Sequence, residues 1–199
     1  MLPRRVAVVA PAGPFWPLDA SQAQAASSRS SMPKVPFSPR FGTVVDVGAS
    51  RGQFALFAKR RFPGARIICF EPLPHSHQVL RSFLGGEVEL VRAAPGAEAC
   101  MATLTVSAHD DSSSLLPIGH RQLSEFPGTH PVDSVEVRVL PLREVLSSEL
   151  PPPRLLKIDV QGLELEVLRG AGSSLDLIDE LFVECSFAEL YGGQAWPTR

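Results

Sequence analysis

Acidic and small residues lie at the end of a hydrophobic segment in the first third of this chain, where they could hold a nucleotide-like ligand. Asp46 lies within a run of valines, and Gly48, Ser50, Gly52 and Gln53 come directly after it. Such a loop brings backbone N–H groups and the start of a helix to the carboxyl end of a strand. Ligands of α/β proteins commonly bind at that place.

The glycine spacing narrows the choice of ligand. A dinucleotide loop needs the pattern G-x-G-x-x-G, and a Walker loop needs Gly-Lys followed by Ser or Thr. Here Gly48 and Gly52 are separated by three residues, so neither pattern is present. Asp46 adds a negative charge at the mouth of the loop, which would repel a phosphate and suit an ammonium or sulfonium group.

A second carboxylate, Glu71, ends the next hydrophobic segment, residues 66–72. At the end of a strand it is placed to accept two hydrogen bonds from a ribose diol. A nucleoside with a cationic tail satisfies both Asp46 and Glu71, and S-adenosylmethionine is one such compound. A nicotinamide-dependent oxidoreductase on a similar sheet is the alternative, and the missing third glycine argues against it.

A third carboxylate, Asp159, ends the hydrophobic segment 154–160. It could accept a proton or orient a nucleophile, or it could cap the helix expected to begin near Gly162. The polar stretch 109–111 (His-Asp-Asp) raises the question of a metal. We expect no bound metal, because no paired Asp or Asn partner at ligand spacing occurs elsewhere in the chain.

The elements that position these residues alternate between strands and helices. Strands are predicted over residues 43–47, 66–72 and 88–91, with helices between them, and this order implies a parallel sheet with right-handed crossovers. Two alternating segments, 102–107 and 135–140, predict an inserted β-hairpin or a pair of edge strands. Two further strands, 154–160 and 181–187, flank a helix over 163–168.

Composition excludes several classes of protein. The 199 residues carry a net charge of -2 and no basic excess, so a nucleic-acid partner is not expected. No apolar run reaches the roughly 20 residues that span a bilayer, so no membrane partner is expected either. The scattered Cys69, Cys100 and Cys185 favour a reduced, cytoplasmic setting.

Residues 1–40 are rich in Ala, Pro, Ser and Arg and bury little apolar surface. We predict a disordered or weakly ordered leader there, followed by one domain over 41–199. A signal peptide within residues 1–12 and an organelle transit peptide are the alternatives.

Four segments together resemble the FkbM family of S-adenosylmethionine-dependent methyltransferases. They are residues 44–54, 70–72, 156–171 (LKIDVQGLELEVLRGA) and 184–194, and the resemblance covers about residues 41–194. It implies a Rossmann-like class I methyltransferase sheet with strand order 3-2-1-4-5. It also implies O-methylation of a hydroxyl on a small molecule or glycan.

The resemblance further assigns roles to single residues. It places Asp159 opposite the transferred methyl as the catalytic residue. Lys157 and Gln161 lie in the same motif but receive no chemical role. The cofactor-binding residues would be Asp46 beneath the loop, Glu71 on the ribose, and Gly48, Ser50, Gly52, Gln53, Ser113 and Ser114.

The family continues after residues 191–194 through a helix and two strands, whereas this sequence ends at Arg199. We therefore expect a fold truncated at the C-terminus, with residues 181–183 as an open sheet edge. Such an edge invites pairing with another chain, so a homo-oligomer through residues 181–187 or a marginal fold is predicted. A non-catalytic remnant of the fold is a further alternative.

Overall fold

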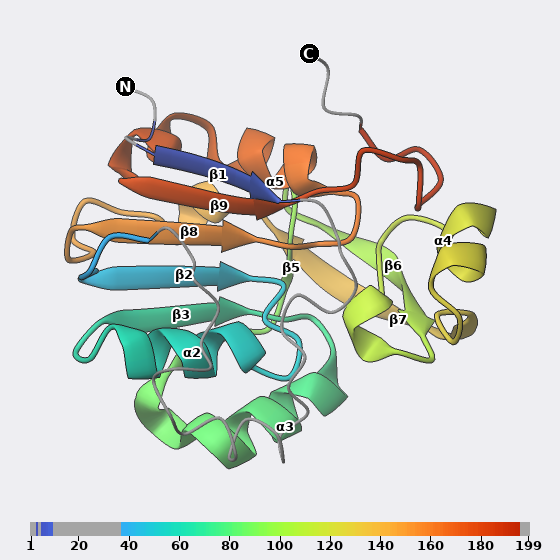
Figure 1. Ribbon diagram of the computed structural model, residues 1–199, viewed down its shortest axis with the longest axis horizontal. Coiled ribbons are helices and arrows are strands. Elements are labelled where there is room, and N and C mark those ends of the chain that lie inside the picture. Colours follow the sequence, from blue (N-terminus) through green and yellow to red (C-terminus); the bar gives the residue numbers. More distant parts are fainter. Residues whose placement is uncertain (1–2, 4, 10–36, 196–199) are drawn as a thin grey trace.

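The computed structural model describes residues 3, 5–9 and 37–195, which form a mixed α/β fold (Figure 1). Its main sheet has six strands whose pairings are all parallel. The parallel α/β sheet predicted from the alternation of elements is therefore confirmed. In spatial order the strands are β1 (Arg5–Val9), β9 (Glu180–Glu184), β8 (Arg154–Ile158), β2 (Thr43–Val47), β3 (Arg66–Phe70) and β4 (Glu89–Val91).

The central strand β2 explains why helices cover both faces of this sheet. All five of its residues are buried, and side chains alternate between the two faces. Val44 packs with one hydrophobic cluster, which includes Phe54 of α2 (Gln53–Arg61) and Leu80 of α3 (Pro74–Leu84). Val45 packs with the other cluster, which includes Val167 of α5 (Glu164–Ala171) and parts of three short segments. These are the 3-10 helices η4 (Leu142–Glu144) and η5 (Gly172–Leu177) and residues 145–150.

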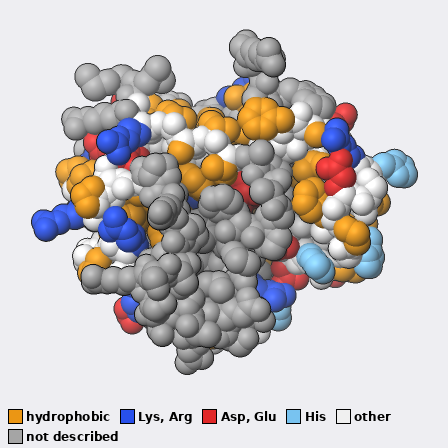
Figure 2. All heavy atoms as spheres, in the orientation of Figure 1, with side chains coloured by type: hydrophobic (Ala, Val, Ile, Leu, Met, Phe, Trp, Pro, Cys, Tyr) orange, Lys and Arg blue, Asp and Glu red, His pale blue; other side chains and the backbone are white. Residues whose placement is uncertain are grey.

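A second, smaller sheet lies at one end of the first. Its strands β6 (Cys100–Ser107) and β7 (Pro131–Leu140) pair antiparallel, which confirms the predicted antiparallel pair. The segment between them holds two elements that were not predicted, η3 (Asp110–Ser112) and α4 (His120–Glu125). Histidine side chains gather on this end of the molecule (Figure 2). The remaining short elements are β5 (Ala94–Pro95), which pairs with β7, and η2 (Gly85–Glu87).

The strand β1 corrects one expectation. It pairs in parallel with β9 over its whole length, from Arg5 opposite Glu180 to Val9 opposite Glu184. The prediction that residues 181–183 form an open edge is therefore wrong. The strand was missed because its five residues lie in a leader whose composition is typical of disorder. The proposed oligomer through residues 181–187 loses this basis, and the oligomeric state stays a prediction.

The other expectations for the leader stand as predictions. Residues 10–36 lie outside the described residues, as do 1–2 and 4. The transit-peptide alternative falls mostly there, and the signal-peptide alternative, residues 1–12, does so apart from residues 3 and 5–9. Within the part of the chain that is described, no helix is both long and apolar enough to cross a membrane. The cytoplasmic location remains a prediction from the cysteine pattern.

The loop after β2 depends on a close backbone contact, and this generates a test of the fold. Gly48 has φ +75°, and a Cβ added to it would lie 1.8 Å from the carbonyl oxygen of Asp159. Gly64 has a similar φ of +86° but nothing within 4 Å of such a Cβ. We predict that Gly64→Ala costs about 1–2 kcal/mol, the cost of a left-handed residue. Gly48→Ala should cost more than about 3 kcal/mol, because the β8 end must also move.

Urea unfolding of the two variants, followed by circular dichroism, measures the difference. Equal losses of stability at the two positions would show that the contact between Gly48 and Asp159 does not constrain the loop.

Candidate active site

Two joined cavities open at the carboxyl ends of the parallel strands. The larger has a volume of about 370 Å³ and extends from the loop after β2 to α4 and residues 126–129. The smaller, of about 80 Å³, lies toward the ends of β3 and β5. Five residues line both cavities and so mark the junction between them: Gly48, Ser50, Asp111, Asp159 and Gln161.

The backbone at this junction is strained. Ser50 has φ +48° and Gln161 has φ +56°, and in the described part of the chain they are the two non-glycine residues with positive φ. Each such residue costs of order 1–3 kcal/mol, and such strain concentrates at functional sites. Ser50 lies on the loop after β2 and Gln161 on the loop after β8. Both loops therefore have a strained backbone where they meet at the junction of the cavities.

The loop after β2 uses its N–H groups internally. Of the five N–H groups of residues 48–52, four donate to acceptors of the protein itself, so no cradle of free N–H groups faces a ligand. Those of Gly48 and Ala49 donate to the Phe70 carbonyl (3.1 and 2.9 Å), that of Ser50 to Glu71 Oε2 (2.8 Å) and that of Gly52 to the Ala49 carbonyl (2.8 Å).

Glu71 lies in the wall of the small cavity with its carboxylate largely buried. Its Oε1 accepts the N–H of Leu73 at 2.8 Å, and its Oε2 accepts the N–H of Ser50. Burial raises the pKa of Glu71 to about 7, although the two backbone hydrogen bonds favour its ionised form. Each carboxylate oxygen retains a second lone pair with which it can accept a hydrogen bond from a ligand.

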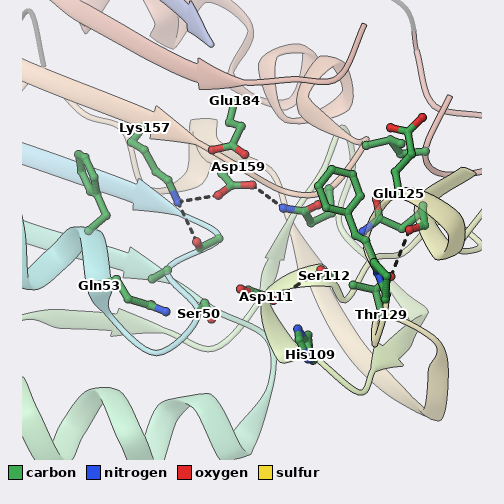
Figure 3. Close-up of a pocket in the computed structure, with 18 residues that line it drawn as sticks. Ser50, Gln53, His109, Asp111, Ser112, Glu125, Thr129, Lys157, Asp159 and Glu184 are labelled. Carbon is green, nitrogen blue, oxygen red and sulfur yellow. Dashed lines mark hydrogen bonds and ion pairs between the residues drawn. The ribbon is translucent and has the colours of Figure 1, made fainter. Parts of the chain in front are cut away.

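The ammonium group of Lys157 lies at the centre of the site. It is buried 3.1 Å from Asp46 Oδ1, 2.9 Å from the carbonyl oxygen of Gly48 and 3.7 Å from Asp159 Oδ2 (Figure 3). Burial opposes its charge, but the carboxylates of Asp46 and Asp159 outweigh burial and raise the pKa of Lys157. Lys157 therefore stays charged and links the end of β8 to the end of β2.

Asp46 has a different place from the one predicted. It is fully buried and lines neither cavity, and burial raises its pKa while Lys157 opposes that rise. Its charge faces Lys157, so the expectation of a negative charge at the mouth of the loop is wrong. The physical reason is the register of β2 with β8, in which residue 46 lies opposite residue 157. The Asp46 side chain therefore points toward Lys157, between the sheet and the helices that cover it, and not into a cavity.

Asp159 is held by its neighbours at the junction. Gln161 Nε2 donates to Asp159 Oδ1 at 2.7 Å, and the Tyr191 hydroxyl lies 2.9 Å from Gln161 Oε1. Burial raises the pKa of Asp159, and Lys157 opposes the rise. The following helix, α5, has no side-chain cap at its N-terminus, and Glu164 Oε1 accepts the N–H of Gly162 in the preceding turn at 3.0 Å. Asp159 thus faces the cavities instead of capping α5.

The other predicted residues divide between the two cavities. Gln53 lines the large one, and Ser113 and Ser114 line the small one, where Ser114 Oγ donates to the Gln161 carbonyl at 2.8 Å. Gly52 lines neither cavity. It lies against Leu80, whose Cγ would be 3.1 Å from an added Cβ, so its contact is with α3.

Sequence reasoning missed several residues of the site. Glu184 ends β9 and lines the large cavity, and burial followed by repulsion from Asp159 raises its pKa to about 8. An acid at the end of a predicted strand was the available signal, the same one that identified Glu71 and Asp159. Lys157, Gln161 and Tyr191 were missed because a motif does not show which side chains bond to one another.

No metal centre is evident in the described residues, where no group of three or more His, Cys, Asp or Glu side chains is arranged to hold an ion. His109 and Asp111 line the large cavity separately. Asp110 instead pairs with Arg51, whose Nη2 lies 2.9 Å from Asp110 Oδ2.

The mostly parallel sheet with helices on both faces is consistent with an α/β domain of the Rossmann-like kind. Residues 46–197 match the family model of the methyltransferase FkbM domain. The chain therefore belongs to the FkbM methyltransferase family.

Three curated proteins are similar to the chain. Methyltransferase sdnD from Sordaria araneosa is 31% identical over 185 residues, covering 77% of this chain and 68% of its own length. Methyltransferase 1 from Beauveria bassiana is 30% identical, with coverages of 71% and 63%. Hexuronic acid methyltransferase AglP from Haloferax volcanii is 31% identical, with coverages of 70% and 54%. No solved structure gave a significant match.

The buried ion pair of Lys157 and Asp46 generates a stability prediction. Lys157→Met leaves the Asp46 carboxylate buried without a counter-charge, which should cost about 3–5 kcal/mol. Lys59→Met is the matched control, because Lys59 pairs with Glu87 at the protein surface. It should cost no more than about 1 kcal/mol.

A double variant completes the test by denaturant unfolding. Adding Asp46→Asn to Lys157→Met removes the stranded charge, so the double variant should be more stable than Lys157→Met alone. If the double variant is less stable than Lys157→Met, or if Lys157→Met and Lys59→Met lose equal free energy of unfolding, the buried pair is not what holds β2 to β8.

Proposed function

We propose that this chain is an S-adenosylmethionine-dependent O-methyltransferase that acts on a hydroxyl of a small molecule or glycan. The observation that carries the proposal is a pair of joined cavities with Glu71 in one, Asp159 at their junction and no free N–H cradle. A nucleoside in the small cavity can then present its tail at the junction, beside the large cavity.

The donor set of the small cavity fits an adenosine. Glu71 can accept hydrogen bonds from the two hydroxyls of a ribose through the lone pairs that its backbone donors leave free. Around it lie apolar side chains that suit a base: Pro72, Leu73, Leu104 and Leu115. The amino-acid tail of the nucleoside would reach polar groups near the junction. These are Ser50 and the carbonyl oxygen of Gly48 at the junction and Gln53 in the large cavity.

S-adenosylmethionine, when bound, supplies an electrophilic methyl group. The chain's own residues then need only to bring a hydroxyl into line with that methyl, and such positioning is worth several kcal/mol of the barrier. Asp159 is suited to orient the hydroxyl, because Gln161 and Lys157 fix its carboxylate at the junction. The large cavity, walled by Gln122, Glu125, Phe126, Pro127 and Leu190, has room for the acceptor.

The structure weighs against the nicotinamide alternative. A dinucleotide's pyrophosphate needs several free N–H donors at the loop, and four of the five here are already bonded within the protein. The large cavity argues against the alternative of a non-catalytic remnant of the fold, because it offers room for an acceptor. AglP acts on a hexuronic acid by its name, which supports a sugar-like acceptor.

Ligand binding tests the proposal directly. We predict that isothermal titration calorimetry detects binding of S-adenosylhomocysteine, and that NAD binds at least tenfold more weakly or not at all. Glu71→Gln should weaken S-adenosylhomocysteine binding by roughly tenfold or more, because hydrogen bonds to a charged group contribute about 1.5–3 kcal/mol. Glu87→Gln, an exposed glutamate on η2, is the control and should bind normally.

Methyl transfer from the tritium-labelled donor to a panel of glycosides is the second readout. Tighter binding of NAD than of S-adenosylhomocysteine would contradict the proposal, as would equal binding by the Glu71→Gln and Glu87→Gln variants.

A further inference from the structure

Glu184 is set apart from the other carboxylates of the site. Its side chain is partly buried in the wall of the large cavity and has no hydrogen bond or ion pair among the described residues. Asp159, by contrast, accepts from Gln161, and Asp46 faces Lys157. The oxygens of Glu184 therefore remain free to bond to a ligand.

The two cavities separate a donor side from an acceptor side. Asp159 lines both cavities, whereas Glu71 lines only the small one and Glu184 does not line the small one. A nucleoside held by Glu71 would therefore reach the junction from the side opposite Glu184. Figure 3 shows the carboxylates of Asp159 and Glu184 next to each other at the ends of β8 and β9. An acceptor hydroxyl in the large cavity would meet Glu184.

The charges that face Glu184 are mostly negative. Asp159 directly after β8, Glu164 on α5 and Asp111 on η3 repel its charge, and Lys157 on β8 attracts it. Lys157 lies 3.1 Å from Asp46 Oδ1 and 3.7 Å from Asp159 Oδ2, so its single positive charge is set against the carboxylates of Asp46, Asp159 and Glu184. Neighbouring carboxylates with too little positive charge bind a proton between them. Burial and repulsion from Asp159 accordingly raise the pKa of Glu184 to about 8.

We propose that Glu184 takes the proton of the acceptor hydroxyl, and that the cationic methyl donor frees it to do so by displacing the proton that Glu184 and Asp159 share. This inference rests on the proposed function. A sulfonium at the junction supplies the positive charge that the cluster lacks. The base is thus ionised only when a methyl group is present to be transferred.

The step balances in atoms and charge. The acceptor oxygen forms a bond to the methyl carbon as the carbon–sulfur bond breaks, and the sulfur keeps that electron pair. The hydroxyl proton passes to the Glu184 carboxylate. With the sulfonium charge gone, the cluster again retains one proton, so the product state has the charge of the free enzyme.

Proton release on binding tests the inference without a known acceptor. S-adenosylmethionine and S-adenosylhomocysteine differ by the methyl group and the sulfonium charge. Calorimetry at pH 7.5 in phosphate, HEPES and Tris buffers gives the protons released by each ligand. We predict that binding of S-adenosylmethionine releases more protons than binding of S-adenosylhomocysteine, by about half a proton or more per site. At pH 9.5 the difference should vanish, because a group with pKa about 8 is already ionised.

Two variants locate the proton. Glu184→Gln should abolish the difference between the ligands and still bind S-adenosylhomocysteine within about threefold of the parent chain. Glu166→Gln, on the exposed side of α5 beside Arg169, should leave the difference unchanged. Equal proton release by the two ligands, or a difference that persists in Glu184→Gln, would overturn the inference. Failure of both ligands to bind would instead overturn the proposed function.

Discussion

The buried ammonium of Lys157 is the interaction on which the rest of the site depends. It contacts a carboxylate of β2, the carbonyl oxygen of Gly48 and the carboxylate of Asp159, so one side chain joins two strand ends and the loop between them. Removing a single partner of such a pair strands a charge in the interior. The lysine also sets the charge of the cavities, because its single positive charge is set against three carboxylates, those of Asp46, Asp159 and Glu184.

Patterns of hydrophobic residues predicted the architecture well. The buried run around Val45, the acids directly after β3 and β8 and the alternation in residues 102–107 each reflect a local constraint that appears in the sequence. The strand β1 did not, because five residues in a leader rich in Ala, Pro and Ser carry no local signal. What makes Arg5–Val9 a strand is its pairing with β9, a contact with residues more than 170 positions away.

The site was predictable to a similar extent. Glu71 and Asp159 could be found because acids at the ends of parallel strands gather at one edge of a sheet. The direction of Asp46 could not, since whether a strand residue faces a cavity or a lysine depends on the register with β8. Glu184 followed the same strand-end rule, but its strand was interpreted as an exposed edge. The cluster of acids around one lysine is thus a property of the assembled sheet.

The central claim is that a sulfonium nucleoside spans both cavities with its sulfur at the junction. A crystal structure of the chain with S-adenosylhomocysteine tests it most directly. The account predicts the ribose diol within hydrogen-bonding distance of Glu71, the sulfur beside Asp159, and Glu184 facing the open part of the large cavity. A ligand bound elsewhere, or one whose ribose does not contact Glu71, would contradict the account.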